Sequence, residues 1–119
     1  MKKMLYVALS LLALALPVYA HTPLTSSIPA AAGTVVPPVK EIVLVFGGDV
    51  RLTALALADS AGAKKAVAEL PTAIAKQFAV AIRDDLGPGE YVATWRAVGA
   101  DTHVVSGEIR FSVAAAHAH

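Results

Sequence analysis

Segments in which apolar and polar residues alternate recur along this chain, and this pattern constrains its fold more than any other feature. The clearest segment runs from Glu90 to Val98, and a second runs from Val104 to Val113. Four residues of the first segment share one face, namely Tyr91, Ala93, Trp95 and Ala97. Because successive side chains point to opposite faces of a β-strand, this spacing predicts two half-buried strands with Trp95 in the core.

Further strands are predicted nearer the N-terminus. A β-branched, apolar run covers residues 41–46 and ends at two glycines, while residues 50–58 and 77–82 alternate. In residues 50–58 strict alternation places four residues on one face, namely Val50, Leu52, Ala54 and Ala56. Residues 64–76 combine helix-favouring types with Pro71, and we expect a short strand or an irregular segment there.

The start of the predicted domain is rich in proline, which excludes a helix from it. These prolines are Pro23, Pro29, Pro37 and Pro38. Together with the turn signals between the strands, the pattern predicts an all-β fold. We expect an antiparallel Greek-key β-sandwich of about seven strands, of the immunoglobulin-like or cupredoxin-like barrel type.

The first twenty residues have the layout of a secretory signal. Lys2 and Lys3 precede an apolar run. Pro17 then breaks the helix, and Ala20 is the small residue after which cleavage is expected. We therefore expect a cleaved signal peptide at 1–20, the β-sandwich at 21–113, and a disordered Ala/His tail at 114–119. An uncleaved anchor is the alternative, although the apolar run is short for a membrane span of ~20 residues.

Composition excludes several classes of site. The chain has no cysteine, and its two methionines, Met1 and Met4, lie in the predicted signal. The exported protein would therefore contain no sulfur ligand. Without Lys2 and Lys3, the 10 basic residues become 8 against 9 acidic ones. This near-neutral balance gives no support for binding to nucleic acid or to an anionic membrane.

His21 is the residue that cleavage after Ala20 would leave at the N-terminus. A histidine there offers two metal ligands, its α-amine and its ring Nδ1. The α-amine has a reference pKa of about 7.7–8.0, so a metal ion can displace its proton near neutral pH. The alternative is an ordinary flexible terminus.

Asp101 and His103 form an Asp-x-His triplet in the loop between the two clearest strands. Both side chains can reach one metal ion if the loop bends. An Asp-initiated turn carrying an exposed histidine is the alternative. His117 and His119 end an Ala-rich tail, where we expect at most loose metal binding.

The chain resembles the CopC family of periplasmic copper-resistance proteins along nearly all of residues 21–113. Four stretches carry the resemblance: His21-Thr-Pro-Leu-Thr-Ser-Ser-Ile-Pro29, Ile42-Val-Leu-Val-Phe46, Gly87-Pro-Gly-Glu-Tyr91-Val-Ala-Thr-Trp95-Arg96, and Asp101-Thr-His103 followed by Val105, Ser106, Gly107 and Phe111. Two shorter matches, Gly33-Thr-Val35 and the pair Pro37 and Pro38, lie between the first two. No single stretch is decisive, but their order and spacing are specific.

The resemblance implies one Cu(II) per chain, bound by the amine and ring of His21, by Asp101 and by His103. Two imidazoles, an amine and a carboxylate suit tetragonal Cu(II), whereas the absence of thioether ligands predicts no Cu(I) site. Thr102 and Val104 depart from the glycine and proline usual in the family. Because a β-branched residue resists the left-handed backbone that glycine allows, we expect the loop to take a different course.

The function implied is a periplasmic, non-enzymatic Cu(II)-binding protein for copper sequestration, resistance or delivery. Its expected partners are the copper ion and an inner-membrane copper importer or another periplasmic cuproprotein, and we expect a monomer that binds no nucleic acid. One alternative is a metal-free structural or interaction sandwich. Another is a copper monooxygenase that cleaves polysaccharides, which an equatorial carboxylate disfavours because Cu(I) prefers softer ligands.

Overall fold

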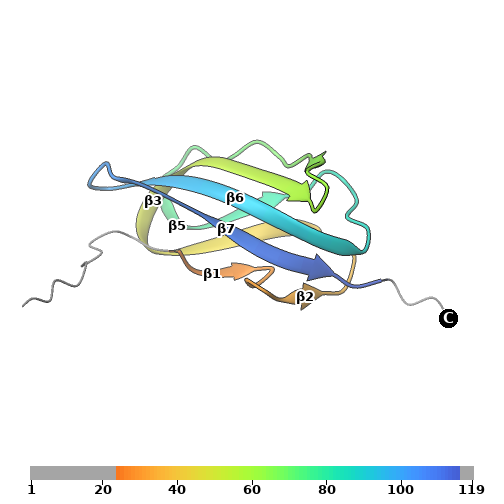
Figure 1. The fold of residues 1–119 in the computed structure, drawn as a ribbon. Helices are drawn as coiled ribbons and strands as arrows, with labels where there is room; N and C mark the ends of the chain where they lie inside the picture. Colours follow the sequence, from red (N-terminus) through yellow and green to blue (C-terminus); the bar gives the residue numbers. More distant parts are fainter. Residues whose placement is uncertain (1–23, 116–119) are drawn as a thin grey trace, which may run out of the picture.

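The structure is a computed structural model that describes residues 24–115. His21, His117 and His119 lie outside these residues, as does the predicted signal peptide. Seven strands make up the described part (Figure 1): β1 (Leu24–Ile28), β2 (Thr34–Val35), β3 (Glu41–Asp59), β4 (Lys64–Lys65), β5 (Ala75–Ala81), β6 (Gly89–Gly99) and β7 (Val104–Val113). Within 24–115 no helix is long and apolar enough to span a membrane. The prediction of an all-β sandwich is confirmed.

Strand β3 connects the two layers of the sandwich. Its first part, up to Phe46, lies between β1 and β5, and its second part, from Val50, pairs with β6 and with β4. In Figure 1 β3 runs to one end of the molecule, turns there and returns in the other layer. The turn falls at residues 47–49, which begin with two glycines, residues that weaken a strand and mark bends. The two runs predicted at 41–46 and 50–58 are therefore one bent strand.

Strands β6 and β7 form a long hairpin with an unbroken antiparallel register from Gly89–Val113 to Val98–Val104. The far edge of β7 carries the short strand β2, which runs parallel to it. This parallel pair departs from the otherwise antiparallel arrangement. It is possible because no hairpin connects β2 to β7, so no tight turn imposes the opposite direction.

The core lies between the two layers. Trp95 is only 6% exposed, and its ring meets that of Phe46 edge-on at a centroid distance of 5.3 Å. Ala93 and Ala97, its neighbours on the same face of β6, are fully buried, as is Leu44 of β3. The alternation read from the sequence of β6 therefore correctly predicts its buried face.

The alternation read from residues 50–58 is wrong in its second half. Val50 and Leu52 are buried, but so are Leu55 and Leu57, which strict alternation assigns to the opposite face. The register with β6 shifts between Leu52 and Ala54. A β-bulge adds one residue to one strand, so every later side chain changes face.

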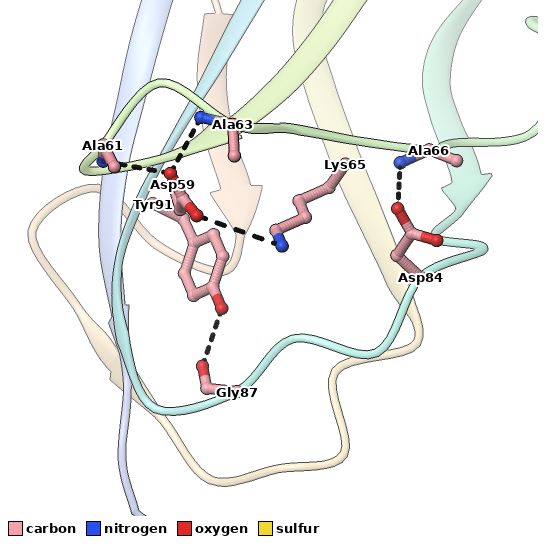
Figure 2. Close-up of polar contacts among 8 residues, drawn as sticks. All are labelled: Asp59, Ala61, Ala63, Lys65, Ala66, Asp84, Gly87 and Tyr91. Atoms are coloured by element: carbon pink, nitrogen blue, oxygen red, sulfur yellow. Dashed lines mark hydrogen bonds and ion pairs between the residues drawn. The ribbon is translucent and has the colours of Figure 1, made fainter.

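Polar contacts stabilise the end of the sandwich opposite the turn that joins β6 to β7 (Figure 2). At the end of β3, Oδ1 of Asp59 accepts hydrogen bonds from the backbone N–H groups of Ala61 and Ala63, both at 2.9 Å. The Tyr91 hydroxyl donates to the Gly87 carbonyl at 2.7 Å. These bonds satisfy the backbone of the tight turns at this end.

Candidate metal centre

The loop between β6 and β7 is held by its own backbone. The N–H of Thr102 donates to the carbonyl of Gly99 at 2.9 Å, and the N–H of Gly99 donates to the carbonyl of His103 at 3.0 Å. These bonds close a short turn over residues 99–103. Asp101 and His103 therefore lie in a hairpin turn that two backbone hydrogen bonds close.

Thr102 adopts the left-handed backbone conformation that we expected it to resist, with a φ of 68°. Left-handed geometry costs a residue with a Cβ roughly 1–2 kcal/mol. Here the turn bond from its N–H offsets part of that cost, and its hydroxyl donates to the carbonyl of Asp101. The β-branched side chain therefore does not keep Thr102 out of this conformation, because closure of the hairpin outweighs a local preference.

Asp101 and His103 contact each other through two hydrogen bonds. Oδ1 of Asp101 accepts the backbone N–H of His103 at 3.1 Å, and Oδ2 lies 2.8 Å from the ring Nδ1 of His103. Both side chains are open to solvent, with exposed fractions of 49% and 66%. The Asp-initiated turn considered from the sequence is thus present, and it brings the two predicted ligands together.

The hydrogen bond from the side chain of His103, followed by that from its backbone N–H, lowers the pKa of Asp101 below its ordinary value. A carboxylate that accepts such bonds is stabilised in its charged form. Asp101 is therefore an anionic oxygen donor at neutral pH, which is the form that binds a metal ion.

The register of β3 brings this hairpin to the end of the molecule where β1 begins. Phe46 pairs with Leu24, the first residue of β1, and Val50 pairs with Gly99, the last residue of β6. Only the bend at residues 47–49 separates these two pairings along β3. Figure 1 shows the β6–β7 hairpin projecting from this bent end of the sandwich.

His21 stands three positions before Leu24 in the sequence, outside the described residues. Within residues 24–115, no group of three or more His, Cys, Asp or Glu side chains is arranged to hold a metal ion. Asp101 and His103 thus form a pair of candidate donors rather than such a group of three.

Asp49 lies at the same end, a placement that the sequence alone left undecided. It occupies the bend of β3 between the pairings of Phe46 and Val50, and it is exposed. Glu41, the other acidic residue of β3 before the bend, pairs with Ala81 at the opposite end of the strand. In the sequence, the glycine pair before Asp49 indicates a bend, but it does not indicate which other segments lie next to that bend.

Comparison with known families identifies the chain. A family model described as the CopC domain matches residues 24–114, which take in all seven strands. The chain belongs to the CopC family. The matched range includes Asp101 and His103 and begins after His21. No match was found among curated proteins.

Solved structures that resemble this CopC domain include the following two. The crystal structure of PcoC, a methionine-rich copper resistance protein from Escherichia coli, is similar at a TM-score of 0.66 and 32% sequence identity, covering 79% of this chain and 99% of PcoC. The crystal structure of CopC from Methylosinus trichosporium OB3b is similar at a TM-score of 0.70 and 24% identity, covering 83% of this chain and 99% of that protein. The similarity to the Methylosinus trichosporium protein, at 24% identity, shows a shared fold and nothing further.

Proposed function

We propose that this protein binds one Cu(II) ion at its processed N-terminus, through the α-amine and ring of His21, the carboxylate of Asp101 and the ring of His103. The contact between Asp101 and His103 on the β6–β7 hairpin carries the proposal. It joins an anionic oxygen and an imidazole, two of the donor types that tetragonal Cu(II) prefers.

The position of β1 supports the participation of His21. Leu24 pairs with Phe46 just before the bend of β3, and Val50, just after the bend, pairs with Gly99 at the end of β6. Three residues of extended chain span at most roughly 10 Å. Only a short segment therefore separates His21 from the end of the sandwich that carries the other two ligands.

The donor set favours Cu(II) over Cu(I). The chain has no cysteine, and both of its methionines precede residue 5. Thioether and thiolate sulfur are the ligands that select Cu(I). PcoC, to which this chain is similar, is described as methionine-rich, so the two proteins differ in this respect.

The role we propose is copper sequestration, resistance or delivery in the periplasm, without catalysis. Export would require the segment 1–20, whose basic start and apolar run have the layout of a signal peptide. A membrane importer or another periplasmic cuproprotein would exchange copper with it. The relation to PcoC, a copper resistance protein, supports this role.

The test is a titration of the exported protein with Cu(II), after its N-terminus has been sequenced. We expect His21 as the first residue and one equivalent of Cu(II) with a tetragonal electron paramagnetic resonance (EPR) spectrum. The control is the same protein with one alanine added before His21, which removes the free amine from the histidine but leaves the ring. A spectrum in the control that differs from that of the wild type supports the proposal, and an identical spectrum in both proteins overturns it.

A further inference from the structure

Asp101 uses both of its carboxylate oxygens on His103. One oxygen accepts the backbone N–H and the other contacts ring Nδ1 at 2.8 Å. We call this pair of hydrogen bonds the Asp101–His103 clasp. It involves the same two side chains that the proposed function assigns to copper.

The clasp defines which ring nitrogen carries the proton. An ionised carboxylate can only accept hydrogen bonds, and a neutral imidazole has one N–H donor and one lone-pair nitrogen. The contact at Oδ2 therefore requires the proton on Nδ1 of His103. The lone pair of the neutral ring then belongs to Nε2.

The clasp and a copper ion shared by both side chains exclude each other. If the metal binds Nδ1, it takes the position that Oδ2 of Asp101 now faces. If it binds Nε2, it lies on the opposite edge of the imidazole, since the two nitrogens direct their bonds away from each other. A carboxylate held 2.8 Å from Nδ1 cannot then reach a metal roughly 2 Å beyond Nε2.

We propose that Cu(II) binding opens the Asp101–His103 clasp, with Asp101 moving from the imidazole to the metal. This inference rests on the proposed function, because it takes Asp101 and His103 as ligands of one ion. Asp101 thus has two successive roles, orienting the ring in the metal-free protein and binding copper in the loaded one. The imidazole keeps one proton throughout, on whichever nitrogen does not bind the metal. The exposure of both side chains leaves room for the exchange.

The metal-free half of the proposal is tested by nitrogen-15 NMR of the His103 ring at a pH where it is neutral. We expect the Nδ1–H tautomer in the wild type and a shift toward the Nε2–H tautomer in Asp101→Ala. Asp85→Ala is the matched control, because it removes an exposed carboxylate just before β6, at the end of that strand opposite the turn that carries Asp101. The same tautomer in the wild type and Asp101→Ala would overturn the clasp.

The copper-loaded half is tested by two EPR measurements on the wild type and Asp101→Ala. The continuous-wave spectrum reports the atoms bound to Cu(II), and electron spin-echo modulation reports the remote nitrogen of a bound imidazole and its hydrogen bond. We expect Asp101→Ala to shift the first spectrum and to leave the remote-nitrogen coupling of His103 unchanged. The reverse result, an unchanged first spectrum with a shifted remote nitrogen, would mean that the clasp persists around bound copper, and would overturn the proposal.

The continuous-wave and spin-echo EPR measurements together distinguish a failure of this inference from a failure of the proposed copper site. Absence of a stoichiometric Cu(II) spectrum in the wild type would overturn the copper site itself, whatever the tautomer of His103. A normal Cu(II) spectrum together with a persistent clasp would overturn the exchange and remove Asp101 from the ligand set, while copper binding by His21 and His103 would stand. His103→Ala, which removes the ring from both states, assigns the remote-nitrogen signal.

Discussion

The indole ring of Trp95 lies directly against the backbone of Gly107, its cross-strand partner in β7. A Cβ placed on Gly107 would come within 2.9 Å of Cζ2 and 3.1 Å of Nε1 of Trp95. The ring has little room to withdraw, because it is buried and meets Phe46 edge-on. The absence of a side chain at position 107 is thus what allows the largest core residue to fit.

Gly107→Ala is therefore expected to destabilise the fold. Overpacking a core costs typically 1–3 kcal/mol, which exceeds the 0.5–1 kcal/mol that alanine gains over glycine in a strand. We expect a net loss of about 1–2 kcal/mol in the free energy of unfolding, measured by urea titration. Gly87→Ala is the control, since a Cβ there meets nothing within 4 Å. Equal stability of the two variants would contradict this packing argument.

His103→Ala is expected to weaken Cu(II) binding, because it removes one of the proposed ligands. Loss of a residue that only hydrogen-bonds to a metal ligand typically lowers metal affinity by roughly 10–100-fold. Loss of the ligand itself should therefore lower the affinity by about 100-fold or more. Competition with a Cu(II) chelator of known affinity measures this change. His117→Ala is the control and should leave the affinity unchanged. An equal loss in both variants would show that the tail contributes to metal binding as much as the hairpin, and would contradict the ligand assignment.

The metal-free protein should show an unusually acidic Asp101. Its pKa is lowered by the hydrogen bonds from His103, so folding favours the ionised carboxylate. The resulting stabilisation is present above the unfolded-state value of about 3.9 and is lost as pH falls through the lower folded-state pKa. A carbon-13 titration of the side-chain carboxyl should therefore place the pKa of Asp101 below 3.8. His103→Ala should return it toward that value, and a normal pKa in the wild type would contradict the contact.

Thr102→Gly is expected to stabilise the protein. Thr102 has a φ of 68°, and glycine adopts this region without the penalty of roughly 1–2 kcal/mol that a Cβ brings. Glycine also loses more backbone entropy on folding, by about 0.5–1 kcal/mol, so a net gain of about 0.5–1 kcal/mol is expected in urea titration. Thr94→Gly, at an exposed position within β6, should instead lose about 1 kcal/mol. Destabilisation by both variants would argue against strain at Thr102.

The alternation of apolar and polar residues was sufficient to predict the buried face of a strand where that strand keeps a constant register. The alternation of β6 predicted the burial of Trp95 and its neighbours, because β6 pairs with β7 without interruption. It failed after Leu52, where the bulge opposite β6 changes the face of each later residue. A bulge depends on the partner strand, which no window of the sequence contains.

The sequence by itself determined the strands close to β5, β6 and β7, the absence of cysteine and of methionine after residue 4, and the Asp-x-His triplet between the two clearest strands. Only the tertiary structure decided that β3 bends at residues 47–49, and that this bend carries the start of β1 and the β6–β7 hairpin to one end of the sandwich. It also decided that Thr102 turns left-handed and that Asp101 holds His103 through both oxygens. The physical reason is range: side-chain periodicity acts between near neighbours, whereas register, bends and hairpin closure depend on pairings between segments far apart in the chain.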